Sequence, residues 1–322
     1  MTVTDASTGN PLGVYIGTVA RPYSLGNLPF DLARDINYYW RVDEVNASNP
    51  YSPWKGEIWM FRNTDYLVID DFNSYLGSDD MNQRWQTNYD LSPACYTNAQ
   101  AGLHWDDNNQ LMQFYYDNTG LYGVYFSEDR LDANGDDWTG AGALPAGDPV
   151  VALAISYLGN AFNTADPTYD RMYIGLEDIH GDFNMVLNPD PNAARNFYQW
   201  NQWNIALADL GVPSPVNLSA VKYLYLGFGE RCNYYVPGGS GTVLFDDLRL
   251  YQRRCVPDLN SPPGDFSHDC RVDLYDVEVM SQEWLSEGIV ADIYPQGSRD
   301  YIVNFRDFAV LAGKWLTETV WP

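Results

Sequence analysis

Acidic residues are concentrated in one short stretch near the C-terminus, GDFSHDCRVDLYD, and this stretch limits what the chain can fold into. Its carboxylates, at Asp265, Asp269, Asp273 and Asp276, follow one another closely, and Asp258 lies just upstream. Like charges repel strongly at such short range. The stretch is therefore compatible with a compact fold only if a positive charge lies among these side chains.

The spacing matches the ligand positions of a calcium-binding loop. Oxygen donors fall at positions one, three, five, nine and twelve, and position seven supplies a backbone carbonyl, as in an EF-hand loop. The ligands are Asp265, Ser267, Asp269, Arg271 (through its carbonyl), Asp273 and Asp276. Two positions depart from the EF-hand pattern: Cys270 replaces the usual glycine, and Asp276 replaces the usual glutamate.

A second copy of the pattern follows thirty-one residues later. Counting by that offset gives the ligands Gln296, Ser298, Asp300, Ile302 (through its carbonyl), Asn304 and Asp307. Each copy leads into apolar residues at helical spacing, namely Val277, Met280, Trp284 and Leu285, then Phe308, Leu311, Trp315 and Leu316. We expect two loop–helix units whose Trp and Leu faces pack together. The first loop should bind calcium more tightly, because Gln296 holds position one of the second.

Residues 255–320 therefore resemble a dockerin-type module, a duplicated calcium-binding loop–helix unit in which Asp at position twelve is usual. The resemblance implies a docking role toward a cohesin-like protein partner or a surface scaffold. The alternative is a pair of solvated acidic loops without metal.

Composition narrows the class of partner. Asp and Glu number 43 against 18 Lys and Arg, a net charge of −25. Nucleic acid and anionic membrane surfaces are therefore excluded as expected partners, because both are bound through basic residues. The sequence contains no run of eighteen apolar residues, so no membrane span is predicted. The 25 Tyr and 11 Trp suit β-sandwiches and sugar-binding surfaces, although β-sheet packing alone would account for most of them.

The N-terminal sequence MTVTDASTGNPLG lacks the basic start and apolar centre of a signal peptide. Calcium loops with ligand sets of this kind nevertheless work at the millimolar calcium found outside cells. We therefore expect an extracellular or cell-surface protein, of which this chain is a fragment.

Four cysteines allow three pairings. We expect Cys255 to pair with Cys270, because the two are near neighbours at the module boundary, and Cys95 with Cys232. The alternative is four buried thiols. No Cys/His cluster suggests zinc.

Residues 1–64 contain the alternating segment INYYWRVDEVN and the second strand GEIWMFRN. They resemble the last strands of a fibronectin type III or immunoglobulin-like sandwich. A whole domain of that type needs about 90–100 residues, so this one would be partial and would act as a spacer.

Residues 65–252 alternate short apolar strands with Gly, Asn, Asp and Pro, which predicts a two-sheet jelly-roll. Alternation in VLFDDLRL places Asp246 on the same face as Leu244, Leu248 and Leu250, which is the apolar face. Burying an unpaired carboxylate there is costly, and a bound cation would remove that cost. The domain resembles the galactose-binding-like sandwiches of carbohydrate-binding modules. That resemblance implies a structural calcium between the terminal strands, with Asp71 and Asp246 as ligands. The alternative is a solvated pair of edge carboxylates.

Aromatic residues of this domain are candidates for stacking on a sugar ring, and we select Trp200 and Trp85. Trp203 alternates with Ile205 and Leu207, which predicts a core position and leaves Trp200 exposed. Core packing is the commoner role for any single aromatic residue.

No nucleophile, metalloprotease or nucleotide-binding motif occurs in the sequence. Glu128 and Glu177 are the best candidates for a glycosidase acid/base pair, without a specific argument for either. The whole arrangement resembles extracellular multidomain proteins of planctomycete-type bacteria. We expect a non-catalytic adaptor that binds glycan and docks through its calcium module. The alternatives are the accessory region of a secreted glycoside hydrolase involved in polysaccharide degradation, and a purely structural surface protein.

Overall fold

The computed structural model describes the following residues of the chain: 36–41, 48, 51, 54–63, 66–87, 90–92, 95–106, 109–120, 123–140, 149–212, 215–232, 235–286, 290–295 and 300–322. The chain divides into two compact units, Met1–Tyr66 and Leu67–Pro322.

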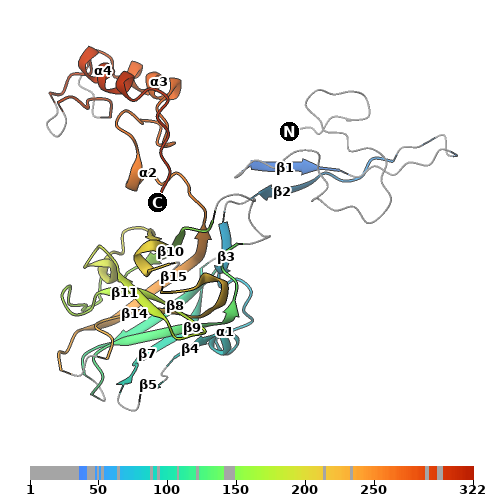
Figure 1. The fold of residues 1–322 in the computed structure, drawn as a ribbon, viewed down its shortest axis with the longest axis vertical. Coiled ribbons are helices and arrows are strands. Elements are labelled where there is room, and N and C mark those ends of the chain that lie inside the picture. The colour runs from blue at the N-terminus through green and yellow to red at the C-terminus, as the bar shows by residue number, and fades with distance from the viewer. Residues whose placement is uncertain are drawn as a thin grey trace. The chain divides into compact units, whose positions relative to one another are not determined.

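The helices and strands, labelled in Figure 1 where space allows, are β1 (Ile36–Trp40), β2 (Trp59–Asn63), β3 (Tyr66–Asp70), α1 (Ser78–Arg84), β4 (Trp85–Gln86), β5 (Asp90–Ser92), β6 (Cys95–Tyr96), β7 (Ala99–Asp106), β8 (Asn109–Asp117), β9 (Ser127–Asp136), β10 (Ala152–Leu158), β11 (Met172–Asp178), β12 (Phe183–Leu187), β13 (Asn201–Ala206), β14 (Val221–Phe228), β15 (Ser240–Tyr251), α2 (Pro257–Asn260), α3 (Leu274–Gln282) and α4 (Phe305–Gly313).

The first unit contains a two-stranded antiparallel ladder. Strand β1 pairs with β2 from Ile36 opposite Asn63 to Trp40 opposite Trp59. The indole rings of the last pair lie 6.2 Å apart, a contact between aromatic cross-strand neighbours that stabilises such ladders. Most of residues 1–64 lie outside the described part, so the fibronectin-like interpretation stays a prediction.

The second unit begins with a β-sandwich of two antiparallel sheets (Figure 1). One sheet has the strand order β13-β10-β15-β8-β7, with β3 paired to β15, and the other has the order β12-β11-β14-β9-β4. The mainly β architecture predicted for residues 65–252 is therefore present. The small β5–β6 ladder lies outside both sheets.

Large aromatic side chains from both sheets fill the space between them. Phe114 and Phe245 of one sheet meet Phe228 of the other, with ring centroids 5.5 and 6.4 Å from that of Phe228. The Tyr116 ring stacks on Phe228 at 4.6 Å. Burying each such side chain contributes about 1.5–3 kcal/mol, so this cluster is a main source of the sandwich's stability.

Strand β15 carries an irregularity that changes which residues face the core. Asp247 has a φ of 52°, and the pairing of β15 with β10 shifts register at this level. The extra residue of a bulge reverses the alternation of side chains. Phe245 is therefore buried on the core side and Leu244 is not, which makes the predicted shared face of Leu244, Asp246, Leu248 and Leu250 wrong.

The C-terminal part contains two loop–helix units around a small core. Met280 of α3 and Leu311 of α4 are buried there together with Val272 and Val303, which immediately precede the helices. The predicted packing of the Trp and Leu faces is only partly correct. Helices α3 and α4 end before the Trp–Leu pairs, and three of these four side chains are exposed: Leu285, Trp315 and Leu316.

Candidate metal centres and ligand-binding surfaces

The first acidic loop is held by two buried carboxylates. Asp265, at its start, accepts the backbone N–H of Asp269 on Oδ1 at 3.1 Å and that of Cys270 on Oδ2 at 2.9 Å. Asp276, at its end, is fully buried and accepts the N–H of Phe266 at 2.7 Å. These bonds pull both ends of the loop onto its own backbone.

The end of the loop also begins α3. The Asp273 side chain caps the helix by accepting the N–H of Tyr275, and Asp276 accepts the N–H of Asp273 at 2.7 Å. Reciprocal bonds of this kind satisfy backbone donors that a helix leaves without partners at its N-terminus. Helix α4 begins in the same way, with Asn304 as the cap and Asp307 as its reciprocal partner.

The second loop repeats these bonds, but its first residue is Asp292 and not Gln296. Asp292 is buried and accepts the N–H of Tyr301 at 2.7 Å, as Asp265 accepts that of Cys270. Asp307 accepts the N–H of Ile293, as Asp276 accepts that of Phe266. Tyr301 and Cys270 both have a φ of 63°.

These bonds make Asp292, and not Gln296, the counterpart of Asp265, because the second loop is longer than the first; Gln296 as a metal ligand stays a prediction. The first spans residues 265–276 and the second 292–307, four residues more. A fixed offset counted back from Asp307 misses the insertion. Comparison of GDFS with ADIY, where an Asp precedes an apolar residue in each, would have found it. Gln296 and Ser298 themselves lie outside the described residues.

The oxygen donors of both loops suit a hard cation such as calcium. Among the described residues, Asp292 Oδ1 is buried and has no hydrogen-bond partner. A buried carboxylate oxygen without a donor is costly, and a bound cation would satisfy it. Within the described ranges, however, no three His, Cys, Asp or Glu side chains converge on one point as metal ligands. Carboxylates that now accept backbone N–H groups would have to turn inward to bind a cation.

If calcium binds, the ligands of the first loop would be those predicted. In the second loop they would be Asp292, Asp300, the Ile302 carbonyl, Asn304 and Asp307. Asp300 Oδ1 accepts the N–H of Ile302 at 3.0 Å, as Asp269 Oδ1 accepts that of Arg271. The two loops therefore share one backbone design despite their different lengths.

A disulfide joins the first loop to the segment that follows the sandwich. Cys255 and Cys270 are bonded, with Cα atoms 5.5 Å apart. Cys270 stands at the loop position where EF-hands carry glycine, so the bond fixes the backbone where it turns most sharply. Cys232 is also disulfide-bonded, and the side chain of its expected partner, Cys95, lies outside the described residues.

The terminal-strand carboxylates of the sandwich have protein donors in place of the predicted cation. Asp246 Oδ2 accepts the Asn109 amide at 2.8 Å, and its Oδ1 accepts the N–H of Asp247 at 2.7 Å. Asp71 Oδ1 accepts the N–H of Asn73 at 3.1 Å. Burial raises the pKa of Asp246. The burial cost that motivated a calcium ion between Asp71 and Asp246 is thus met by hydrogen bonds, and that site stays a prediction.

Trp85 cannot stack on a ligand, and this prediction is wrong. Its side chain is fully buried, and its indole N–H donates to Asp70 Oδ2 at 2.9 Å. Asp70 also accepts the Tyr75 hydroxyl and the N–H of Phe72. The Asp70 carboxylate is therefore a structural centre that fixes β3 against the core.

Trp200 is 39% exposed, whereas Trp203 is buried, as the alternation predicted. Trp200 belongs to a surface segment that carries further exposed rings. The segment before β13 lies beside the loop after β10, because Asn160 donates its N–H to Ala194 and Gly159 donates to Asn196. Among the aromatic side chains that these two loops expose, we name the following four the aromatic patch: Phe162, Phe197, Tyr198 and Trp200.

Glu128 lies on the outer face of the five-stranded sheet, in register with Gly227. It is fully buried and ion-paired with Arg231 at 3.1 Å. Tyr173 donates its hydroxyl to Glu128 at 2.6 Å across Gly227, which pairs with both of these residues. A substrate cannot reach this carboxylate.

Glu177, on the same sheet, accepts the Tyr225 hydroxyl and lies 3.8 Å from the Lys222 ammonium. Burial raises the pKa of Tyr225, so the hydroxyl stays protonated and available as a donor. The contacts of Glu128 and Glu177 are those of a structural network.

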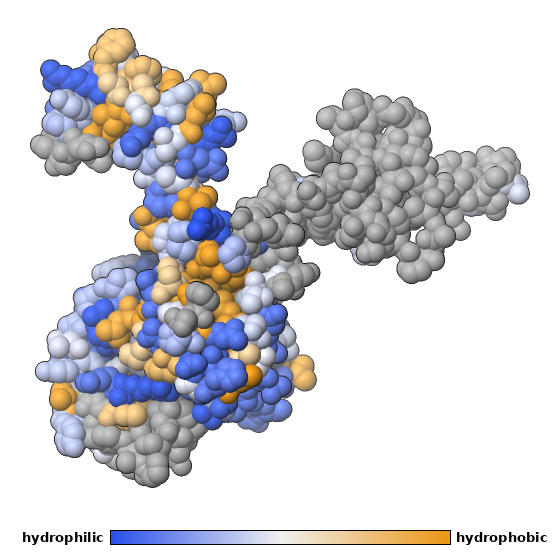
Figure 2. All heavy atoms as spheres, in the orientation of Figure 1, coloured by the Kyte–Doolittle hydropathy of each residue, from blue (hydrophilic) through white to orange (hydrophobic). Residues whose placement is uncertain are grey.

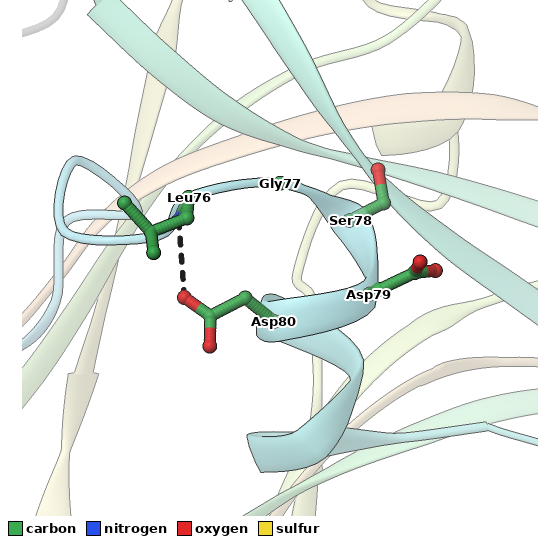
Figure 3. A pocket seen from close by; sticks show the side chains of 5 residues that line it. All are labelled: Leu76, Gly77, Ser78, Asp79 and Asp80. Atoms are coloured by element: carbon green, nitrogen blue, oxygen red, sulfur yellow. Dashed lines mark hydrogen bonds between the residues drawn. The ribbon is translucent and has the colours of Figure 1, made fainter.

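A shallow hollow opens at the start of α1 (Figure 3). It is lined by Leu76, Gly77, Ser78, Asp79 and Asp80, and Asp80 accepts the N–H of Leu76 at 3.0 Å. The Ser78 hydroxyl is also hydrogen-bonded within the protein, since its Oγ accepts the N–H of Leu103 at 2.9 Å. These groups stabilise the turn into the helix.

Neither a protein-family model nor a curated protein matches the chain. Solved structures that align with it include a promiscuous carbohydrate-binding module of the β-sandwich superfamily (8% identity, 66% of this chain, 73% of that chain, TM-score 0.33). Others are CBM27-1 of Caldicellulosiruptor saccharolyticus with mannohexaose (11%, 58%, 97%, TM-score 0.33) and the non-crystalline-cellulose-specific module CBM28 (10%, 52%, 88%, TM-score 0.31). Because these similarities are low, the β-sandwich assignment depends on the strand order and core described above.

None of the helices in the described part of the chain is both long enough and apolar enough to cross a bilayer.

Proposed function

We propose that this protein is a non-catalytic extracellular adaptor, whose β-sandwich binds glycan and whose C-terminal module binds calcium and docks to a protein partner. The proposal depends most on one observation: the two acidic loops repeat the same hydrogen bonds around a buried first Asp and a buried last Asp. The unpartnered oxygen of Asp292 supports a cation in the second loop.

Calcium would supply charge neutralisation and fix the loops. Without it, the buried carboxylates depend on neutral donors, namely backbone N–H groups and, at Asp265, the Ser261 hydroxyl at 2.8 Å. Removing ions from water is costly unless each charge is compensated. The dockerin-like assignment, including a cohesin-like partner, follows from the same duplicated pattern. The acidic composition agrees with a protein that works at extracellular calcium concentrations.

The glycan-binding part of the proposal depends on the aromatic patch. Exposed rings present flat apolar faces suited to stacking on a sugar, and Asn160, Asn196 and Gln199 provide amides in the same two loops. The Asn196 side-chain amide donates a hydrogen bond to Asn201 Oδ1 at 3.1 Å, which holds the loop against the start of β13. Amides held near exposed rings could hydrogen-bond the hydroxyls of a sugar stacked on those rings.

Affinity electrophoresis in gels that contain soluble xylan, mannan or mixed-linkage glucan tests this part. We expect retardation of the full chain by at least one polysaccharide, and its loss in Trp200→Ala. Trp105→Ala is the matched control, because Trp105 is 61% exposed on β7, outside the two loops. Equal migration of wild type and Trp200→Ala in every gel would contradict binding at the patch.

Measurement of reducing ends in the same mixtures separates the adaptor from the alternative function. An adaptor binds and releases none. Release of sugar by the wild type that Glu177→Gln abolishes would instead favour a glycoside hydrolase.

A further inference from the structure

The two halves of the C-terminal module are joined by matching contacts. Leu285, after α3, donates its N–H to the Val303 carbonyl at 2.8 Å, and Leu316, after α4, donates to the Val272 carbonyl at 2.8 Å. The end of each helix therefore lies beside the start of the other. Each junction contains a tryptophan from a helix end and the first residue of the opposite helix.

The two junctions are filled differently. At one, the first residue of α4, Phe305, packs edge-to-face on Trp284, with ring centroids 5.0 Å apart and an interplanar angle of 86°, while its side chain stays 75% exposed. At the other, the first residue of α3 is Leu274, whose side chain is 72% exposed, and Trp315 is 42% exposed.

A groove of about 440 Å³ is present at the second junction, and we name it the Trp315 groove. It is lined by Asp273, Leu274, Tyr275, Glu278, Trp315 and Leu316. Figure 2 shows exposed hydrophobic residues on the visible face of this module. Apolar side chains that gather on a surface in this way mark interaction sites.

We propose that the Trp315 groove binds an aromatic side chain of a protein partner, presented beside basic residues. The chain itself shows which side chain suits such a junction, because Phe305 occupies the equivalent place against Trp284. Aromatic pairs prefer this edge-to-face arrangement and gain from it beyond the area they bury.

The charges around the groove select the flanking residues of the partner. Asp273 and Glu278 line it. Asp273 has a cationic neighbour, Arg271 at 3.6 Å, and is also a proposed calcium ligand, whereas Glu278 has no ion pair among those described. A net charge of −25 also repels acidic partners at long range. The partner is therefore expected to carry Lys or Arg beside the aromatic residue. This inference depends on the docking role proposed above and names the chemistry of the partner.

The probes are the peptides Ac-Lys-Phe-Lys-NH2 and Ac-Lys-Ala-Lys-NH2, titrated into the full chain in millimolar calcium. The chain is labelled with 5-fluorotryptophan, and the Trp315 signal is assigned by its loss in Trp315→Phe. We expect the Phe peptide to shift this signal with saturation and the Ala peptide to bind at least ten-fold more weakly.

Two reciprocal variants use the difference between the halves. Leu274→Phe fills the groove from within, as Phe305 does at the other junction, and should weaken the Phe peptide at least ten-fold. Phe305→Leu empties the other junction, so the Trp284 signal should then respond as well. Both positions are exposed, and circular dichroism checks that each variant keeps the wild-type fold.

Equal responses to the Phe and Ala peptides, or unchanged peptide binding by Leu274→Phe, would overturn the proposal. A shift of the Trp315 signal by neutral oligosaccharide and not by peptide would also overturn it. The effect of calcium on melting of the same samples reports the calcium-dependent function separately. Absence of peptide binding together with calcium-dependent melting would contradict the groove proposal alone. Absence of any calcium effect on melting would contradict the proposed function.

Discussion

Asp129 is a carboxylic acid buried in the core of the sandwich, and it leads to a quantitative prediction. It pairs in register with Leu226 of β14, whose side chain belongs to the core, and its own side chain is fully buried. Neither of its carboxylate oxygens has a hydrogen-bond partner. Burial, and secondarily the charge of neighbouring Glu128, raise the pKa of Asp129 well above 3.8.

The sign of the resulting pH dependence follows from linkage. Because the folded state holds the proton more tightly than the unfolded state, this group contributes its full stability below the unfolded pKa. That contribution is lost as the pH rises from about 4 to the folded pKa, at about 1.4 kcal/mol per pH unit. Asp129→Asn removes the titration, so the difference in unfolding free energy between variant and wild type should grow with pH at that slope.

Thermal unfolding followed by calorimetry from pH 4 to pH 8, in chelator to exclude calcium effects, measures the difference. One kcal/mol corresponds to about 2–4 °C in a domain of this size, so the variant should gain several degrees over two pH units. Asp132→Asn, on the same strand but only partly buried, is the control and should show no such trend. A pH-independent difference for Asp129→Asn would refute the reasoning.

Three further predictions concern stability and the disulfide. Gly227→Ala would place a Cβ 2.4 Å from the Tyr173 ring, so we expect about 1–3 kcal/mol of destabilisation by overpacking, measured by urea denaturation; an unchanged midpoint would contradict the close contact. Trp85→Phe leaves Asp70 without one donor, and we expect a loss of about 1–3 kcal/mol in the same assay, against less than about 0.5 for Trp105→Phe. Cys255→Ser with Cys270→Ser opens a cross-link over a sequence separation of 15, and we expect the C-terminal module alone to lose about 3 kcal/mol; equal loss in the sandwich would contradict this.

Sequence patterns predicted the sandwich and the two loop–helix units because both depend on local regularities. Short apolar runs broken by Gly, Asn, Asp and Pro identify strands such as β11 and β14, and apolar residues at helical spacing identify α3 and α4. The exposed position of Trp200 followed from its offset from Trp203. In each case nearby residues alone determine the outcome.

The errors arise where an insertion or a long-range contact intervenes. The bulge at Asp247 reverses the facing of side chains without any glycine to indicate it. Asp292 was missed because a fixed offset assumes loops of equal length. Trp85 was misassigned because its partner, Asp70, is fifteen residues away in sequence and becomes a neighbour only after folding.

Calcium binding by the second loop is the most direct test of the central claim. Isothermal titration of calcium into the chelator-treated full chain should show two equivalents. Saturation should also raise the melting temperature of the C-terminal module, because free calcium at one hundred times the dissociation constant of a site adds about 2.7 kcal/mol to the free energy of unfolding. Asp292→Asn should remove one equivalent, while Gln296→Ala should retain both. Identical melting in calcium and in chelator, or loss of an equivalent in Gln296→Ala but not in Asp292→Asn, would contradict the account.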